Sequence, residues 1–342
     1  MLWERLFAGA VVIAAAAAAG NAMLPDGPPA VAAPAALRLD AAPLPLNPDD
    51  RAQDRVGALR FAGAVQLSSP DRLFGGLSGL RWRDDGSLVA VSDTGNWLSF
   101  RPVERGGRLV GAEGGRIAAI VMADGRPAAT KADGDAEALE WTGGVAEVFF
   151  EQDHRLQRYR AAATGALPDG APTDVRHVTP TIAWPSNGGG EAFARLDAEA
   201  ALAISEQGRG RDGHHDALLL TAAGATRLAI APPRGFSPTD AVLLDANRLL
   251  LLTRRFDGVS VAAKLVLVDL GALQAARRAG GVPADLLLPS RELATLAPPL
   301  TLDNMEGLAL RREGGRVFLY LVSDDNLSPA QRTLLMKFEL DP

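Results

Sequence analysis

The sequence contains no cysteine among its 342 residues. This absence excludes disulfide bonds, thiolate metal sites and a cysteine nucleophile. It also excludes lipoprotein attachment, which needs a cysteine after the apolar leader. The chain has no excess of basic residues either, since its net charge is −6. We therefore expect no nucleic-acid partner, because binding to phosphates requires a basic stripe on the surface.

Several enzyme motifs are also missing. Ser186–Gly190 is rich in glycine but lacks the lysine and the following helix of a phosphate-binding P-loop. Ser78 is not in a nucleophile elbow, because no glycine stands two places after it. The four histidines do not have zincin spacing, and the adjacent pair His214 and His215 is expected at the surface.

The first 22 residues are typical of an export signal. Arg5 precedes an apolar, alanine-rich run from Phe7 to Gly20, and Gly20–Ala22 supplies the small residues that a signal peptidase requires. The run is short for a membrane span of roughly 20 residues. We predict that residues 1–22 are cleaved, so that a periplasmic or secreted protein without a membrane span remains. An uncleaved N-terminal anchor is the alternative.

The composition changes after the leader and again near residue 56. Residues 23–55 are rich in proline and alanine, which predicts an extended linker or ordered strap without its own core. Residues 56–342 consist of short alternating or apolar runs broken by Gly, Asp, Asn and Pro, a texture typical of an all-β domain.

A degenerate phrase recurs through this domain. Its clearest copy is Asn304–Leu308, in which a carboxylate, a small residue and an apolar residue begin a strand-like run. Four altered copies occur earlier in the chain: Leu77–Leu80, Asp135–Leu139, Gly190–Phe193 and Thr239–Val242. A repeat in fixed order, with a period of about 45–65 residues, indicates a propeller or an array.

The runs sort into blocks of about four strands, and we predict a β-propeller of five four-stranded blades. The last block is one strand short, whereas Leu59–Leu67 has no block of its own. A propeller must close its ring, so the N- and C-terminal strands are expected to share one blade. Six blades is the alternative, because the fourth block is long and contains a helical stretch near Leu273–Arg278.

Propeller geometry converts the repeat into a site prediction. The head of each innermost strand lies beside the end of the second strand, at one mouth of the channel. We predict an inner ring of residues at this mouth: Ser78, Glu137, Glu191, Asp240 and Glu306. We predict a second ring just outside it: Asp93, Glu151, Glu206, Arg254 and Asp324.

Crowded carboxylates in a concave mouth repel one another, so some are protonated or a cation neutralises them. Oxygen donors favour a hard cation, calcium first and magnesium or manganese next. The predicted metal ligands are Glu137, Glu191, Asp240, Glu306 and Glu206, and Asn187, Asn304 and Asp325 are further oxygen donors. The alternative is structural: strand-head carboxylates often accept backbone N–H bonds from the next blade and brace it.

Several motifs together resemble a known family. They are Phe74–Leu80, Ser92–Gly95, Glu137–Leu139, Asn304–Leu308 and the segment from Ser323–Asn326 through Gln331–Leu335. In this order they resemble the bacterial phytase-like family described as having esterase-like activity of phytase. The resemblance covers roughly Leu59 to the C-terminus. It implies a β-propeller, export, and hydrolysis of ester or phosphoester bonds, with calcium-dependent propeller phytases as the analogy.

The main hypothesis is thus an exported, calcium-dependent hydrolase of ester or phosphoester bonds that acts on a small, anionic ester, with magnesium or manganese as alternative metals. Asp93 and Asp324 are candidate general bases, and Arg254 is a candidate catalytic anion clamp. The predicted substrate-binding residues are Arg254, Arg255, Arg209 and Arg211. This is fewer basic residues than calcium-dependent phytases use, which argues against phytate. A monomer is expected. The alternatives are a non-catalytic periplasmic binding or scaffold protein and a sugar-lactone hydrolase.

Overall fold

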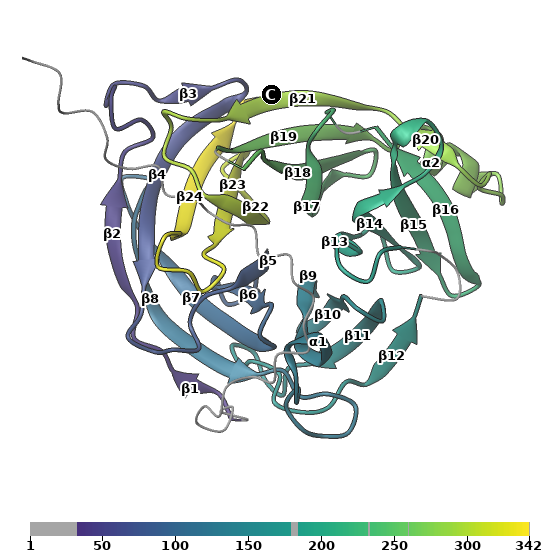
Figure 1. Ribbon diagram of the computed structural model, residues 1–342, viewed down its shortest axis with the longest axis horizontal. Coiled ribbons are helices and arrows are strands. Elements are labelled where there is room, and N and C mark those ends of the chain that lie inside the picture. The colour runs from purple at the N-terminus through teal and green to yellow at the C-terminus, as the bar shows by residue number, and fades with distance from the viewer. Residues whose placement is uncertain (1–32, 179–183, 232, 259, 342) are drawn as a thin grey trace, which may run out of the picture.

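A computed structural model describes residues 33–178, 184–231, 233–258 and 260–341. The predicted signal peptide, residues 1–22, lies outside this part of the chain. The described chain forms five sheets arranged around a central axis, with the innermost strands β5, β9, β13, β17 and β22 facing the centre (Figure 1). The predicted all-β propeller of five blades is therefore confirmed.

Blades 1 and 2 follow the predicted order from centre to rim. Blade 1 contains β5 (Leu77–Trp82), β6 (Leu88–Ser92), β7 (Asn96–Arg105), β8 (Arg108–Ala119) and, at its outer edge, the short β1 (Ala35–Ala36). Blade 2 contains β9 (Ala136–Thr142), β10 (Val145–Phe150), β11 (Arg155–Arg160) and β12 (Asp174–His177). The short helix α1 (Lys131–Gly134) precedes β9.

Blades 3 and 4 are connected by a loop and also by an edge strand, which follows strands of blade 4 in sequence and pairs within blade 3. Blade 3 contains β13 (Gly190–Arg195), β14 (Ala200–Arg209), β15 (His215–Thr221), β16 (Gly224–Ile230) and the parallel edge strand β20 (Leu286–Leu288). Blade 4 contains β17 (Ser237–Asp245), β18 (Arg248–Phe256), β19 (Val261–Asp269) and β21 (Ser290–Leu296). A short 3-10 segment, η2 (Arg211–Gly213), joins β14 to β15.

The long insert within the fourth block does not form a sixth blade. Its predicted helical stretch is helix α2 (Gly271–Arg278), which is followed by β20. Strand β20 leaves blade 4 and pairs with β16 of blade 3, through Leu228 opposite Leu286. The insert therefore ties two neighbouring blades together at the rim (Figure 1).

Blade 5 closes the ring as predicted. It contains β22 (Asn304–Glu313), β23 (Arg316–Asp324), β24 (Thr333–Leu340), β4 (Leu59–Ser68) and β2 (Asp40–Leu44), and the short β3 (Arg55–Val56) pairs with β4. The closing contact is antiparallel, with Leu335 of β24 opposite Val65 of β4. The proline- and alanine-rich segment adds β2 outside β4 and β1 outside β8, so its described part lies along blades 5 and 1.

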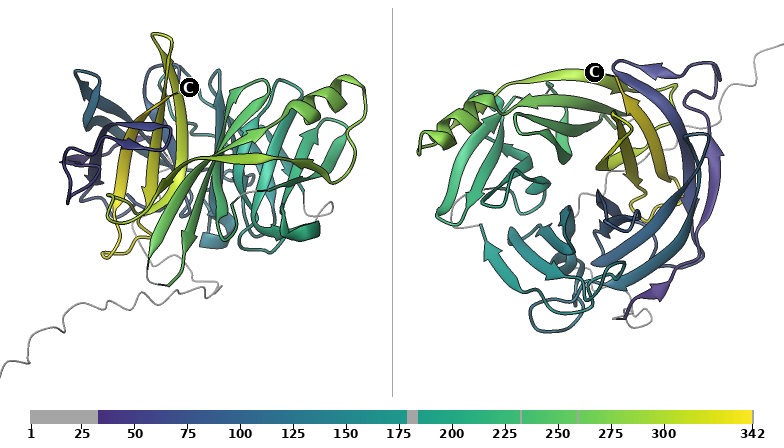
Figure 2. Two further views of the ribbon diagram at one scale, coloured as in Figure 1. Left: turned by 90° about the horizontal axis from the view of Figure 1, so that it is seen from above. Right: turned by 180° about the vertical axis from the view of Figure 1, so that it is seen from behind.

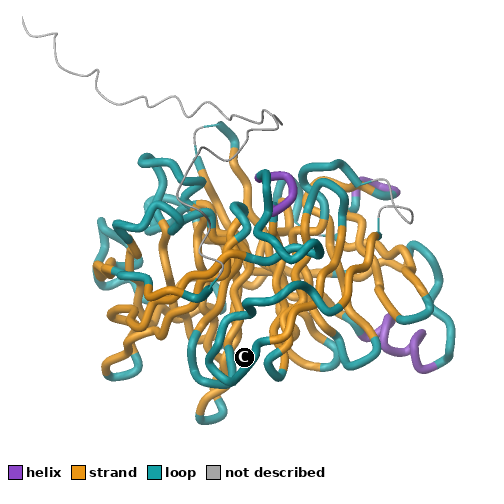
Figure 3. The backbone as a smooth tube through the Cα atoms, turned by 90° about the horizontal axis from the view of Figure 1, so that it is seen from below, coloured by secondary structure: helices purple, strands orange, loops and turns teal. Residues whose placement is uncertain are grey.

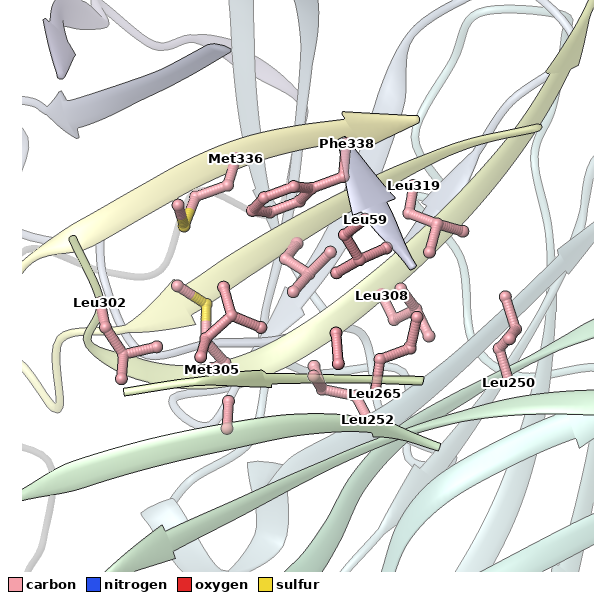
Figure 4. Close-up of a cluster of buried hydrophobic side chains, with 14 of the residues drawn as sticks. Leu59, Leu250, Leu252, Leu265, Leu302, Met305, Leu308, Leu319, Met336 and Phe338 are labelled. Carbon is pink, nitrogen blue, oxygen red and sulfur yellow. The ribbon is translucent and has the colours of Figure 1, made fainter. Parts of the chain in front are cut away.

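The core consists of five hydrophobic clusters, one between each pair of adjacent blades. Alternate residues of one strand enter different clusters. In β18, Leu250 and Leu252 pack toward blade 5, whereas Leu249 and Leu251 pack toward blade 3. Figure 4 shows the cluster between blades 4 and 5, where Leu252 and Leu265 lie near Met305 and Leu308. Strands buried on both faces explain the uninterrupted apolar runs of the sequence.

The blades form a disc whose strands lie between two faces covered by loops (Figures 2 and 3). One face carries the heads of the innermost strands, and the opposite face carries their ends. Among the helices of the described chain, none is long and apolar enough to span a membrane. The predicted site residues are at the strand-head face, which we call the mouth.

Candidate functional site

Every innermost strand has a β-bulge near its head. The register skips one residue in each pairing of first and second strand, and a bulge of this kind turns one side chain away from the ladder. The extra residues are Gly79, Glu137, Glu191, Thr239 and Glu306. The predicted inner ring is thus structurally equivalent in three blades, through Glu137, Glu191 and Glu306.

The ring is interrupted in blades 1 and 4. In both blades the residue predicted from the repeat lies one position away from the bulge. In blade 1 the bulge residue is Gly79 and not Ser78. A Cβ at Gly79 would lie 2.9 Å from the backbone nitrogen of Leu139, and its φ is +59°, so a carboxylate cannot replace it. In blade 4 the bulge residue is Thr239, whose hydroxyl donates to the carbonyl of Met305.

Asp240 is therefore not part of the inner ring, and its prediction as a metal ligand is not supported by the geometry. Its side chain is fully buried and accepts hydrogen bonds from Arg81 Nη1 at 2.9 Å and Arg81 Nη2 at 3.0 Å. It also accepts from the backbone N–H of Leu308 at 2.7 Å. Burial raises the pKa of Asp240, and Arg81 opposes this rise. Both carboxylate oxygens already have partners, which leaves neither free for a cation.

Arg81 connects all five blades at the centre of the disc. Its guanidinium donates to carbonyls of its own blade 1, blade 3, blade 4 and blade 5: Leu80, Phe193, Ala241 and Leu308. Its Nε lies 3.6 Å from Glu140 Oε2 of blade 2. We call this arrangement of Arg81, Asp240 and the surrounding carbonyls the arginine knot. It occupies the space between the innermost strands beneath the mouth.

The second predicted ring lies in register in four blades. Glu151, Glu206, Arg254 and Asp324 each lie opposite the residue two places before a bulge. In blade 1 this position is Ser92, and Asp93 lies one place beyond it, bonded through its N–H to the carbonyl of Gly76. Oδ1 of Asp93 is buried against Gly76 without a hydrogen-bond partner in the described structure.

Three carboxylates of blade 2 form the tightest acidic cluster. Oxygen atoms of Asp135, Glu137 and Glu151 lie within 4.8 Å of one another, and all three side chains are buried or half-buried. Ser78 donates to Glu137 at 2.9 Å across the boundary between blades 1 and 2. We call Asp135, Glu137 and Glu151 the acidic triad. Such a set of hard oxygen donors fits a divalent cation like calcium.

The glycine-rich stretch before β13 supports this triad. The backbone N–H groups of Gly188 and Gly189 donate to Glu151 Oε1 at 2.6 and 2.5 Å. A Cβ at Gly189 would lie 2.3 Å from the ring of His154, so only glycine allows this close approach. Ser186–Gly190 therefore binds a carboxylate of the neighbouring blade with its backbone.

Burial and mutual repulsion shift the titration of these acids. Burial raises the pKa values of Glu137 and Glu191 well above their usual range, and neighbouring carboxylates add to the rise. Burial raises the pKa of Glu151 to about 7, although a hydrogen bond from Glu191 and the N–H of Gly189 favour its ionised form. The charges of Glu191 and Glu151 thus oppose each other's ionisation. Like charges held this closely favour either protonation or a bound cation.

On the far side of the mouth, Arg254 lies between two carboxylates. Its Nη2 is 3.0 Å from Glu206 Oε1, and its Nε is 2.7 Å from Glu306 Oε1. Burial raises the pKa of Glu306 to about 8 despite Arg254, with Asp324 and Glu206 contributing. Glu306 also accepts from Asn304 at 2.8 Å. Because both sides of its guanidinium are occupied, Arg254 balances charge here and is not arranged as an anion clamp.

Asp93 and Asp324 approach each other from blades 1 and 5. Burial raises the pKa of Asp324 to about 7, and the charge of Asp93 contributes. Burial also raises the pKa of Asp93, although Lys131 lies 3.1 Å from its Oδ2 and opposes the rise. Asp325 fixes the adjoining loop, because it accepts from the N–H of Gly76 and from Thr333.

The remaining predicted arginines do not form one anion-binding group. Arg209 donates to the carbonyl of Glu206 at 2.7 Å and contacts His215. Arg255 is exposed and lies over the ring of Phe236, with Asp257 3.9 Å away. The side chain of Arg211 lies outside the described part of the structure. Among those whose side chains are described, only Arg254 meets the acids of the mouth directly.

Two functional candidates were not identified by sequence reasoning. Lys131 follows Thr130, the N-cap of α1, and its Nζ lies 2.7 Å from Asp135 Oδ1 as well as near Asp93. Asp135 itself was noted only as the start of a repeat copy. The expected surface position of His215 is wrong, because its buried ring bonds the carbonyls of Ser205 and Phe236.

The solved structures similar to this chain resemble it only weakly. The chain is similar in fold to PQQ-bound aldose sugar dehydrogenase from Streptomyces coelicolor, with 12% identity, 89% of this chain and 98% of that chain covered, and a TM-score of 0.40. It is also similar to Semaphorin 1b from Drosophila, with 9% identity, 84% and 55% covered, and a TM-score of 0.37. Similarities this low carry no information on function. No curated protein matches the sequence.

A family model gives a more specific result. The model described as "Phytase-like: Esterase-like activity of phytase" matches residues 72–327. This range runs from just before β5 to the loop after β23, so it includes every residue of both rings. Because the match covers most of the chain, the protein belongs to the phytase-like family.

Proposed function

We propose that the protein is a divalent-metal-dependent hydrolase of ester or phosphoester bonds, with calcium as the metal. The observation that carries the proposal is the acidic triad, whose carboxylate oxygens lie within 4.8 Å of one another. Among the described residues, only Lys131 brings a positive charge into contact with it, at Asp135. Membership of the phytase-like family supports hydrolysis as the reaction class.

The chemistry of the donors fits the proposed metal. The triad supplies carboxylate oxygens and no sulfur or imidazole, a set that suits calcium, and magnesium or manganese less well. Asp135, Glu137 and Glu151 would hold the ion, with Glu191 next to Glu151. The raised pKa values of Glu137 and Glu191 support this assignment, because a cation relieves the same repulsion that protonation relieves.

The residues around the triad have separate roles in the proposed reaction. When bound, the metal would polarise the scissile bond and lower the pKa of a water molecule. Asp324 is the proposed general base, since a pKa of about 7 makes its carboxylate available near neutral pH. Asp93 is the second candidate, and its unpartnered Oδ1 is a free acceptor.

The structure changes the proposed contacts with an anionic substrate. Arg254 is bound by Glu206 and Glu306, whereas the side chain of Lys131 is 47% exposed at the mouth. We therefore assign to Lys131 the contact with a substrate oxygen that the sequence analysis gave to Arg254. With carboxylates outnumbering these two cations, the mouth suits a small substrate with few negative charges.

Metal analysis and a substrate panel test the proposal together. The purified protein is assayed for bound metal, then for hydrolysis of a carboxylic ester, a phosphomonoester and a sugar lactone, each with calcium and with chelator. We expect calcium-dependent hydrolysis that Glu137→Gln abolishes and that Glu313→Gln, an exposed control, retains. Calcium binding without hydrolysis of any substrate would refute the enzyme and leave a metal-stabilised binding protein.

One observation favours the scaffold alternative for part of the site. Asp240 and Glu151 both accept backbone N–H groups from another blade, which is how a bracing carboxylate behaves. A pure brace would leave the protein indifferent to calcium. Equal stability of the wild type with calcium and with chelator, together with no bound metal, would therefore establish the scaffold.

We also propose that the protein is exported and acts as a monomer in the periplasm or outside the cell. The support is the sequence of residues 1–22, with its apolar run and small residues at Gly20–Ala22. Mass spectrometry of the natural protein should find a chain that begins near Met23. Intact Met1 in the cytosolic fraction would refute export, and light scattering at two concentrations tests the monomer.

A further inference from the structure

A cavity lies on the face opposite the mouth, between blades 1 and 2. Its volume is about 210 Å³, and its lining includes Arg83, Asp85, Trp141, Arg160 and Thr164. Arg83 follows the end of β5, and the turn Gly143–Gly144 follows the end of β9, so the cavity lies at the far ends of the innermost strands. No residue of the acidic triad borders it.

Arg83 is a buried cation without an ionic partner. Its side chain is only 5% exposed, and it forms no ion pair with any residue that the structure describes. Its Nη2 donates to the carbonyl of Ala166 at 2.7 Å, and its guanidinium lies 5.0 Å from the ring centre of Trp141. Its Nε is buried without a hydrogen-bond partner. A buried donor left unsatisfied is costly, which suggests that a missing acceptor belongs there.

The second arginine of the cavity is also free. Arg160 ends β11 and is exposed, and in the described chain it has neither an ion pair nor a side-chain hydrogen bond. Two carboxylates also line the cavity. Asp85 accepts from both the N–H and the hydroxyl of Ser87 and lies 3.6 Å from Arg101 Nη2. The charge of Arg83 also favours the ionised form of Asp85, but no hydrogen bond or ion pair joins these two residues in the described structure. Asp84 is exposed at the rim.

A neighbouring cavity contains arginines whose charges are neutralised by a carboxylate. It shares Arg160 and is lined by Glu147, Arg158 and Arg195. There Glu147 lies 2.8 Å from Arg158 Nη2 and 2.5 Å from Arg195 Nη2, so one carboxylate neutralises both arginines. Asp84 and Asp85 act on Arg83 at longer range, but among the described residues no carboxylate bonds Arg83 or Arg160 directly. The first cavity therefore lacks the acceptor that the second one contains.

We propose that the cavity between Arg83 and Arg160 binds the oxyanion group of a small molecule, a carboxylate or a phosphate. Two guanidinium groups offer planar pairs of donors that match either oxyanion. The hydroxyl of Thr164 supplies a further donor, and Trp141 forms an apolar wall. The site is independent of the proposed hydrolase, because it lies on the other face and uses none of its residues.

Inorganic phosphate and acetate are the probes, each added in chelator so that calcium at the mouth plays no part. Melting temperatures are compared with those in sodium chloride at equal ionic strength. The melting temperature of the wild type should rise by a few degrees with at least one probe at a concentration far above its Kd, since a ligand that binds only the folded state stabilises that state. The two probes separate phosphate from carboxylate recognition.

Matched variants decide whether the cavity is responsible. Arg160→Gln should lose the shift and retain the fold, because Arg160 is exposed and unpaired. Arg291→Gln, an exposed arginine on the outer strand β21, and Glu137→Gln at the mouth should keep it. Arg83→Gln should also lose the shift in melting temperature. If the Arg83→Gln protein does not fold, the result for Arg160→Gln decides the test. No shift in the wild type, or an equal shift in Arg160→Gln and Arg291→Gln, would overturn the proposal.

Discussion

The arginine knot and the mouth lie in the same channel and are built from the same kinds of residue, yet their electrostatics differ. In the knot, Arg81 and Asp240 form a pair whose polar atoms are bonded to carbonyls and N–H groups of the surrounding blades. In the mouth, carboxylates face one another, and Lys131 and Arg254 neutralise only some of them. In the first arrangement the opposite charges balance within the protein, although Nε of Arg81 has only Glu140 at 3.6 Å, and the second arrangement requires protons or a cation.

This difference distinguishes a structural role from a functional one for acidic residues that look alike in the sequence. A buried pair whose two carboxylate oxygens and two guanidinium Nη atoms are bonded within the protein holds the blades together. A group of buried carboxylates with raised pKa values is costly to maintain, and perturbed titration of this kind concentrates at functional sites. Changes in the knot should therefore affect folding, and changes in the mouth should affect the response to calcium and pH.

The largest effect is expected from Arg81→Met. Removing one partner of a buried pair leaves Asp240 charged and unpaired, which costs about 3–5 kcal/mol. Urea denaturation in chelator measures the loss of unfolding free energy. Arg81→Met combined with Asp240→Leu should recover part of it, because no buried charge then remains. A loss below about 1 kcal/mol for Arg81→Met would show that the knot is not a structural centre.

The next effect concerns the triad and calcium. At about 100 times its Kd, calcium should add about 2.7 kcal/mol to the wild type, and Glu137→Gln should remove most of this gain. In chelator the same variant should be at least as stable as the wild type, because it relieves repulsion with Asp135 and Glu151. Thermal unfolding of both proteins in both conditions makes the comparison. Destabilisation of Glu137→Gln in chelator, with no calcium effect on the wild type, would contradict the metal site.

The pH dependence of stability tests the same contrast more finely. The pKa of Glu306 is about 8 in the folded protein, above its ordinary value of 4.5, so the native state holds a proton that the unfolded state releases. Between these values, without metal, stability should fall as pH rises, by about 1.4 kcal/mol per pH unit for each such carboxyl. Glu306→Gln should reduce the slope, whereas Glu313→Gln should not. Equal slopes in all three proteins would disprove the raised pKa.

The smallest effect is expected from Arg255→Gln. Arg255 was a predicted substrate ligand, but it is exposed and directed to Phe236 and Asp257. The change should alter stability by less than about 0.5 kcal/mol, as exposed substitutions usually do. Activity on the best substrate of the panel should be unchanged. A large rise in KM would return Arg255 to the site.

The fold could be predicted because its signals are local. Each strand is an apolar run of the right length, and the spare strand Leu59–Leu67 needed a partner that only the last block lacked. The exact ring could not be predicted, because a one-residue bulge is invisible in a degenerate repeat. Thus Asp240 looked equivalent to Glu306, although Thr239 takes that position.

The other contacts that the sequence did not predict are made by long side chains. The partners of Arg81 in blades 3, 4 and 5 are separated from it by 112 to 227 residues, so no spacing in the sequence indicates the knot. Lys131 reaches Asp93 from a short helix in another loop. The signal that could have found it is its position four residues before Asp135, a spacing that favours an ion pair on one helical turn. Arg254 lies at the mouth, but its ion pairs with Glu206 and Glu306 determine its role, and these pairs cannot be seen in the sequence.

The pairing of β4 with β24 has a consequence for biosynthesis. Strand β4 ends at Ser68, and its partner β24 begins only at Thr333 and ends at Leu340. Until the ribosome has made β24, strand β4 has no neighbour on the side that closes the ring. The ring therefore cannot close before β24 has been synthesised. The nascent chain thus keeps an open strand edge until then, and a chain that stopped before Thr333 would leave the whole ring unclosed.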